Sequence, residues 1–328
     1  MLSIVIACQN KNKQDVPKFK SIKHLQGKIL NDSLILGTGT DIFLSEEKLY
    51  VSTTPADKYV KIYDSDSGKA IGEIIDKGRG PNEVMYVSSM IIHNDSIIIS
   101  DRGLCRYSKF PLSFINNGSQ SCDLLNFPIS DIIAKNDNKF LIGNVHCEDN
   151  VIRYAWIDNT GKILYSFNEY PNIKISQDKK GIEYLYGLEG KHTTNPNNTK
   201  MFSVCSFGET IEIFDIQDSQ IVKIKEITYR KPIAEVRNRH VMPIMGSTIF
   251  GFMDVYATNN KIYTIYCGDT EGRTLNKIAV FDWEGTPETL YTVDSDILFR
   301  ICVNSEETKI YAIGLNKNRE TVIFSFDI

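Results

Sequence analysis

Short hydrophobic segments alternate with polar turns along the whole chain, and one such segment recurs six times. Each copy follows a polar turn, opens on lysine or serine and continues into apolar residues. The copies begin at Lys48, Ser96, Lys139, Lys200, Lys261 and Lys309. A strand-based repeat with a period of roughly 40–60 residues is typical of a β-propeller, in which each repeat builds one blade.

The other strands of each repeat take regular places around this segment. A strand such as 41–44 or 252–255 precedes it, and a strand such as 59–64 follows it and ends in aspartate before a tight turn. A fourth strand leaves the turn, and no stretch shows sustained helical periodicity. We therefore predict an all-β, six-bladed β-propeller of four-stranded antiparallel blades, with strands A to D numbered outward from the axis.

The last repeat is one strand short. Its segments 299–303, 309–314 and 321–327 supply strands A, B and C, and the sequence ends at Ile328. Closing the ring with an N-terminal strand leaves fewer exposed strand edges. We predict that Phe19 to Leu25 forms strand D of the last blade.

Composition agrees with one globular domain over residues 18–328. The chain is 42% hydrophobic and 24% charged, and its net charge of −4 gives no basic surface for nucleic acid. The histidines and cysteines follow no metal-ligand spacing, and phosphate-binding and hydrolase motifs are missing from the sequence. We expect a monomer without a metal or another cofactor.

Residues 1–17 differ in character from the rest. An apolar run from Leu2 to Ala7 precedes Cys8, and the polar segment Gln9 to Asp15 follows it. This order resembles the end of a bacterial lipoprotein signal, with Cys8 as the lipidated residue and the polar segment as a tether. Since a basic leader and a longer apolar core are missing, we expect the start codon to lie further upstream. The alternative is an N-terminal strand with an incidental cysteine.

One loop carries the sharpest family resemblance. Gly78-Arg-Gly-Pro-Asn-Glu-Val84 resembles the inter-blade loop of NHL-type propellers, and 251–257 followed by Lys261-Ile-Tyr263 resembles the entry to a late blade. With the lipobox, the chain is similar to TolB-like six-bladed propeller lipoproteins of gut-type anaerobic bacteria. That resemblance implies a location in the bacterial cell envelope, with a lipid anchor as the only membrane attachment. The sequence leaves open the periplasmic side and the cell surface, and the lack of a strong acidic run after Cys8 favours the periplasmic side. The resemblance transfers no catalytic residues. An oxidising envelope would permit a disulfide between Cys105 and Cys122, which the sequence leaves open.

The loops between strand D of one blade and strand A of the next are the longest connections. They span 76–87, 168–185 and 228–251, and long loops on a rigid scaffold often carry binding residues. We therefore expect a ligand on this long-loop face of the channel. The candidate binding residues are Arg79, Glu83, Asp131, His192, Arg237, Arg239, His240, Asp254 and Arg300.

Two classes of function remain open. The first is a non-enzymatic module that binds an envelope protein, a peptide or a glycan, and the sequence favours it because no catalytic motif is present. The second is a lyase, lactonase or cyclotransferase, the kinds of enzyme that other six-bladed propellers host. In that case Asp131, His240 and Asp254 would converge at the channel mouth.

Overall fold

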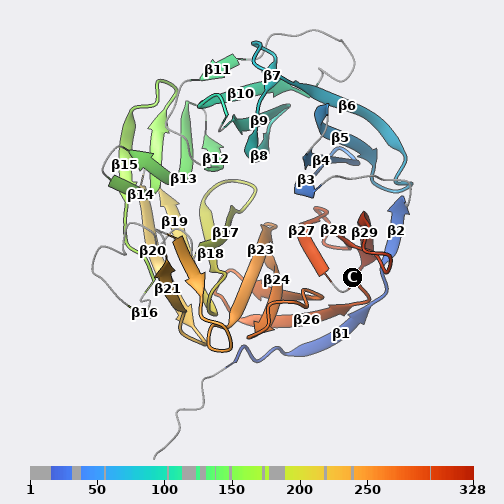
Figure 1. Cartoon of the computed structure of the whole chain (residues 1–328), viewed down its shortest axis with the longest axis vertical. Helices are drawn as coiled ribbons and strands as arrows, with labels where there is room; N and C mark the ends of the chain where they lie inside the picture. The colour runs from blue at the N-terminus through green and yellow to red at the C-terminus, as the bar shows by residue number, and fades with distance from the viewer. Residues whose placement is uncertain are drawn as a thin grey trace, which may run out of the picture.

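The computed structural model describes most of the chain, and Figure 1 shows six sheets arranged as blades around a central channel. The described residues are 16–31, 38–54, 57–101, 103–112, 123–125, 131–136, 138–147, 150–171, 174–176, 189–217, 220–237, 240–295 and 297–328. Within these ranges the regular structure is entirely β, and no helix is long and apolar enough to cross a membrane. The predicted six-bladed, all-β propeller is confirmed.

The first three blades are consecutive meanders. Blade 1 comprises β3 (Thr38–Ser45), β4 (Lys48–Thr54), β5 (Lys58–Asp64) and β6 (Ala70–Lys77). Blade 2 comprises β8 (Val87–His93), β9 (Ser96–Asp101), β10 (Arg106–Pro111) and β11 (Asp123–Leu125). Blade 3 comprises β12 (Asp131–Asn136), β13 (Lys139–Cys147), β14 (Asn150–Asp158) and β15 (Ile163–Phe167). The short β7 (Glu83–Val84) adds to β6 in parallel, as a fifth strand of blade 1.

The last three blades follow the same plan. Blade 4 comprises β17 (Glu189–Thr194), β18 (Lys200–Cys205), β19 (Thr210–Gln217) and β20 (Gln220–Thr228). Blade 5 comprises β23 (Phe250–Ala257), β24 (Lys261–Asp269), β25 (Lys277–Asp282) and β26 (Pro287–Val293). Blade 6 comprises β27 (Ile297–Val303), β28 (Lys309–Leu315) and β29 (Thr321–Asp327), together with β2 (Lys28–Asn31).

The N-terminal strands correct one prediction. The segment Phe19 to Leu25 does not complete blade 6, because β1 (Ser21–Leu25) pairs in parallel with β26 as a fifth strand of blade 5. It is β2 that pairs antiparallel with β29. Between the two, the backbone at Gly27 passes so close to Phe326 that a Cβ would lie 2.6 Å from Cε1 of that ring. Only glycine lets the chain cross to blade 6 at this point.

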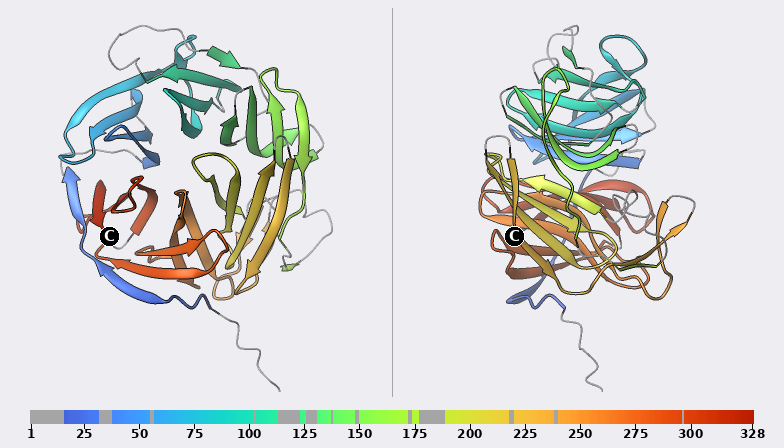
Figure 2. Two further views of the ribbon diagram at one scale, coloured as in Figure 1. Left: turned by 180° about the vertical axis from the view of Figure 1, so that it is seen from behind. Right: turned by 90° about the vertical axis from the view of Figure 1, so that its left-hand side faces the viewer.

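Two of the long D–A connections form a sheet of their own. Strand β16 (Lys174–Ser176), from the connection between blades 3 and 4, pairs in parallel with β21 (Ile233–Arg237). Strand β21 forms a hairpin with β22 (His240–Pro243), and both lie in the connection between blades 4 and 5. In the side view of Figure 2, this hairpin projects from one face of the ring.

A lysine–aspartate pair explains the strand-ending aspartates seen in the sequence. In five blades the first residue of strand B is a lysine that lies directly opposite the last aspartate of strand C. The pairs are Lys48 and Asp64, Lys139 and Asp158, Lys200 and Asp215, Lys261 and Asp282, and Lys309 and Asp327. The Asp64 carboxylate also accepts bonds from Ser67 N at 2.8 Å and Ser67 Oγ at 2.6 Å, and these bonds lower its pKa. The repeat therefore places residues of opposite charge across strands B and C and encodes the turn that follows them.

Candidate functional site

All six inner strands carry a β-bulge. The register of each with its neighbour shifts in the part nearer its N-terminal end, twice in β23, and a bulge redirects the side chain beside it. The residues that follow the last shift in each strand are Asp41, Ser89, Ala134, His192, Asp254 and Arg300. Five of these six positions are therefore polar, in strands whose flanking residues are largely apolar.

A cavity of about 1360 Å³ occupies the channel, and every inner strand contributes to its wall. On β3, β8 and β23 its lining begins at Asp41, Ser89 and Asp254 and continues toward the A–B turns. The first lining residues of the inner strands form the inner end of the cavity, which we call the floor: Asp41, Ser89, Asp131, Lys191, His192, Asp254 and Arg300. The walls reach the turns that join strands A and B.

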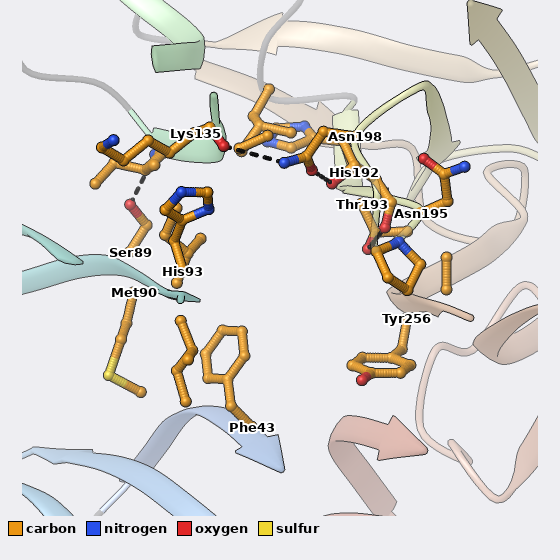
Figure 3. A pocket seen from close by; sticks show the side chains of 18 of the residues that line it. Phe43, Ser89, Met90, His93, Lys135, His192, Thr193, Asn195, Asn198 and Tyr256 are labelled. Atoms are coloured by element: carbon orange, nitrogen blue, oxygen red, sulfur yellow. Dashed lines mark hydrogen bonds between the residues drawn. The ribbon is translucent and has the colours of Figure 1, made fainter. Parts of the chain in front are cut away.

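The two sides of the wall differ in chemistry, as Figure 3 shows. Phe43 and Tyr256 lie on one side and Lys135 and Asn198 on the other. Asn198 Nδ2 donates to the Lys135 carbonyl at 3.1 Å, so this amide fixes the wall between blades 3 and 4. The cavity therefore offers an aromatic surface opposite a polar one.

An ion cluster crosses the channel at the floor. Arg300 Nε lies 3.6 Å from Asp41 Oδ1 and 3.9 Å from Asp254 Oδ1. Lys191 Nζ lies 4.0 Å from Asp41 Oδ1. Lys191 is on β17 of blade 4 and Asp41 on β3 of blade 1, and these blades stand opposite each other in Figure 1. The cluster therefore joins blades that share no strand pairing.

Burial controls the charge of the two carboxyl groups in this cluster. Desolvation raises the pKa of Asp254 to about 6, although Arg300, Lys191 and a bond from Ile301 N at 2.9 Å favour the ionised form. Desolvation likewise raises the pKa of Asp41, against the opposing effect of Lys191 and Arg300. Asp254 consequently changes charge slightly below neutral pH.

The floor beside blade 3 is arranged differently. Asp131 Oδ2 accepts a bond from Asn144 Nδ2 at 3.3 Å, and within the described ranges it forms no ion pair with lysine or arginine. His192 stands edge-on to Tyr154, with 5.7 Å between ring centroids. Burial lowers the pKa of His192 to about 4, so its imidazole is neutral at neutral pH. Buried atoms His192 Nδ1 and Asn144 Oδ1 have no hydrogen-bond partner.

Four of the predicted site residues line the cavity: Asp131, His192, Asp254 and Arg300. Arg79 and Glu83 lie instead in the loop after β6. Glu83 Oε2 accepts a bond from Gly80 N at 2.7 Å, and Arg106 Nη2 donates to the Gly80 and Glu83 carbonyls at 2.7 and 2.6 Å. Arg79 is exposed. The Glu83 and Arg106 side chains therefore hold the backbone of this segment in place.

Of the remaining predicted residues, Arg237 and His240 lie on the β21–β22 hairpin. Arg237 ends β21 and His240 begins β22, as backbone partners in that hairpin. Their side chains, and Arg239 as a whole, lie outside the described residues. The convergence of His240 with Asp131 and Asp254 therefore stays a prediction, as does the Cys105–Cys122 disulfide, since Cys122 also lies outside these ranges.

Sequence reasoning missed three members of the floor, Asp41, Ser89 and Lys191. Signals were present, because Asp41 and Ser89 each precede the first residue of the B-strand repeat by seven residues, as Asp254 does. Lys191 precedes Lys200 by nine residues, as Arg300 precedes Lys309. Aligning the repeats on their B strands would have identified all three. Over the described residues, no three His, Cys, Asp or Glu side chains are placed to hold a metal ion.

Comparison with known proteins gives a family and a fold. The family model for TolB-like 6-blade propeller-like proteins matches residues 18–306. A comparison with curated proteins finds no match. Among solved structures, one from Bacteroides fragilis NCTC 9343 is described as an exported protein. It superposes with a TM-score of 0.58 at 14% sequence identity, and the match covers 93% of this chain and 98% of the other.

Two further solved structures share the fold. The β-propeller domain of Cps50 (Swd1) from Myceliophteria thermophila gives a TM-score of 0.55 at 11% identity, covering 92% of this chain and 99% of that one. A luciferin-regenerating enzyme gives 0.52 at 10% identity, covering 92% and 94%. At such identities these likenesses concern the fold alone.

Proposed function

The chain belongs to the TolB-like six-blade propeller family, and on that premise we propose that it is a lipid-anchored binding module of the bacterial cell envelope. Its ligand, an envelope peptide, protein segment or glycan, enters the central channel. Binding, rather than a reaction, is its activity.

The channel cavity carries this proposal. It is walled by all six inner strands, and its volume of about 1360 Å³ exceeds the 300–1,000 Å³ range typical of small-molecule sites. An aromatic side opposite a polar side, with charged groups at the inner end, suits a ligand that has both apolar and polar parts. Rigid strands hold all of these groups, which lowers the entropic cost of binding.

The face of the ring at which we place the ligand differs from the one expected from the sequence. The long D–A loops favoured the face that carries them, whereas the cavity extends from the charged floor to the A–B turns on the other face. We place the ligand on the A–B side, where the wall is open beyond Phe43 and Tyr256. Some residues of the D–A loops lie outside the described ranges, so that face remains a second expectation.

Envelope location rests on the N-terminus. The apolar run, Cys8 and the polar segment after it have the order of a lipobox and tether. The similar fold from Bacteroides fragilis belongs to a protein described as exported. Phe19, close to the first described residue, packs edge-on against Phe281 of blade 5 with 5.8 Å between ring centroids. The tether would therefore join the ring at a packed and rigid point.

Blocking the cavity tests the binding function. Thr193 lines the cavity, and Thr193→Trp would fill part of it. The matched control is Lys317→Trp, an exposed residue in a B–C turn on the opposite face. Defined envelope peptides and glycan fragments should raise the melting temperature of the wild type and the control, and leave Thr193→Trp unchanged. Equal shifts in all three proteins would place the ligand elsewhere and refute the channel site.

Metabolic labelling tests the anchor. Protein expressed from the full gene should incorporate a palmitate analogue and sediment with membranes, and Cys8→Ser should do neither. A wild type that takes up no lipid would contradict the anchor without bearing on the cavity.

One observation favours the alternative, an enzyme. Asp254 is buried at the floor, and its pKa of about 6 suits general acid–base catalysis near neutral pH. Hydrolysis or elimination on lactones and uronic-acid glycans, lost in Asp254→Asn while ligand binding persists, would support this function. Absence of turnover by the wild type on both substrate classes would leave binding as the function.

A further inference from the structure

The floor of the cavity divides into a compensated part and an uncompensated part. Asp41 and Asp254 face the cations Arg300 and Lys191. Asp131 lines the same cavity on β12, and its side chain has only the amide of Asn144 as a hydrogen-bond donor within the described ranges. A carboxylate provides about four acceptor sites, so most of the capacity of Asp131 is unused.

No described lysine or arginine forms an ion pair with Asp131. His192 is neutral because burial lowers its pKa to about 4. Lys135, on the same strand as Asp131, places its ammonium 5.5 Å from the centroid of the Phe140 ring, and Lys191 pairs with Asp41. Among the described carboxylates of the floor, Asp131 is therefore the one without an ion pair to lysine or arginine.

The surroundings of Asp131 hold it in a fixed place. Asp131 lies opposite Gly143 in the register between β12 and β13, and Asn144 follows directly. The ring of His192 covers Gly143 so closely that a Cβ there would lie 3.0 Å from Cε1 of the ring. Asn144 thus positions the carboxylate from behind and His192 confines it from blade 4. Their two unpartnered atoms, Asn144 Oδ1 and His192 Nδ1, add to the unused polar capacity of this corner.

From this arrangement we propose a cation subsite at Asp131 that binds the primary ammonium group of a peptide ligand. The inference rests on the proposed function, because it names the ligand class of the same cavity. A primary ammonium has three donors and one charge, which matches a single carboxylate among neutral polar neighbours. A divalent metal ion would call for more carboxylate ligands than this corner offers, since Asp41 and Asp254 are engaged by Arg300 and Lys191.

The apolar part of the cavity wall favours a peptide over an amino sugar. Phe43, Ile91, Ile92 and Tyr256 line the cavity. These apolar groups suit leucine-like side chains, whereas a sugar presents hydroxyl groups along most of its edge. A peptide with a free amino terminus would place its ammonium at Asp131 and its first apolar side chains against this wall.

Calorimetric titration with paired peptides tests the subsite. The probes are a leucine-rich tripeptide amide with a free amino terminus and its N-acetylated counterpart. Acetylation removes the charge, so it should weaken binding to the wild type about ten- to hundredfold, the usual value of one charge-assisted hydrogen bond. Asp131→Asn should weaken the free-amine peptide by a similar factor and leave the acetylated peptide unchanged.

A matched control and a folding check accompany this test. Asp95→Asn removes an exposed carboxylate from the β8–β9 turn and should behave as the wild type. The melting temperature of Asp131→Asn shows whether the isosteric change leaves the fold intact, and Asp131→Glu should recover part of the preference for the free amine.

Several results would overturn the subsite. They are equal affinity for the two peptides, an amine preference that persists in Asp131→Asn, no peptide binding up to millimolar concentration, tighter binding of glucosamine than of the peptide, and binding of Ca²⁺ or Zn²⁺ alone that depends on Asp131. An envelope ligand excluded by Thr193→Trp but indifferent to Asp131→Asn would remove the subsite and leave the proposed function standing.

Discussion

Two parts of the channel floor contain similar residues but differ in how the charges are paired. Around β3, β23 and β27, two buried carboxylates face Arg300 and Lys191, and the cluster joins blades across the ring. Around β12 and β17, one carboxylate, one amide and one imidazole stand together with polar capacity unused. The first arrangement links blades across the ring, and the second is the one that we propose for a ligand.

The two parts also respond to pH in opposite directions. The raised pKa of Asp254 means that the folded state holds a proton that the unfolded state has released between about pH 4 and pH 6. Its contribution to stability is therefore lost as pH rises through that window. The lowered pKa of His192 reverses the sign, because the unfolded state binds the extra proton between about pH 4 and pH 6.5. Its contribution is lost as pH falls.

The largest effect should come from removing the strand that completes the blade of Arg300. A chain starting at residue 32 lacks β1 and β2, so blade 6 loses its outer strand and Leu30 leaves its cluster with Ile323 and Tyr63. We expect loss of cooperative thermal unfolding, or aggregation. A chain starting at residue 16 retains both strands and should melt as the full protein does. An unchanged melting temperature of the shorter chain would show that the pairing of β2 with β29 contributes nothing to the stability of the ring.

Arg300→Ala should have the next largest effect. It leaves Asp41 and Asp254 facing only Lys191, and an unpaired buried charge is costly. Breaking a fully buried pair costs 3–5 kcal/mol, and we expect about 2 kcal/mol because the Arg300 side chain stays 25% exposed. Urea denaturation at pH 7.5 measures this loss. It should shrink at pH 4.5, where the carboxyl group of Asp254 is protonated and no longer needs the guanidinium, and a loss independent of pH would contradict the electrostatic explanation.

The sequence predicted this fold better than it predicted this contrast. The B-strand lysines and C-strand aspartates are local signals, and they located strands A to D in most repeats. These local signals could not show which of β1 and β2 completes blade 6. Both segments are short and alternate between polar and apolar residues, and their places depend on pairing with β26 and β29, which lie far along the chain. At the site, Asp131, His192, Asp254 and Arg300 were chosen because they lie close to the connections between strand D of one blade and strand A of the next. The Arg237 to His240 segment was chosen for its charge density, which is also usual in solvated loops.

A pair of variants tests the opposite pH dependences. Asp254→Asn removes the contribution of Asp254, so between pH 4.5 and pH 7 its stability should rise by about 2 kcal/mol relative to the wild type. His192→Phe, which keeps an aromatic ring against Tyr154, removes the contribution of His192, so its stability should fall by about 2 kcal/mol relative to the wild type over the same range. The wild type should lie between them, since its two slopes oppose each other. Chemical denaturation across this range, with Asp95→Asn as the control, measures all four slopes. Parallel slopes in the two variants would refute the contrast.

The smallest effect should come from Asp131→Asn, and its smallness is informative. Asp131 has no ion pair to lose within the described residues, and asparagine keeps an oxygen that can accept the bond from Asn144. We expect a change in unfolding free energy within about 0.5 kcal/mol, as for changes that disturb no specific interaction. Asp41→Asn breaks contacts with both Arg300 and Lys191 and should cost about 1 kcal/mol or more. Urea denaturation of both variants at pH 7.5 compares the costs directly. A large loss from Asp131→Asn would place Asp131 in the stabilising part of the floor, whereas a negligible one combined with weakened peptide binding would separate function from stability within one ring of side chains.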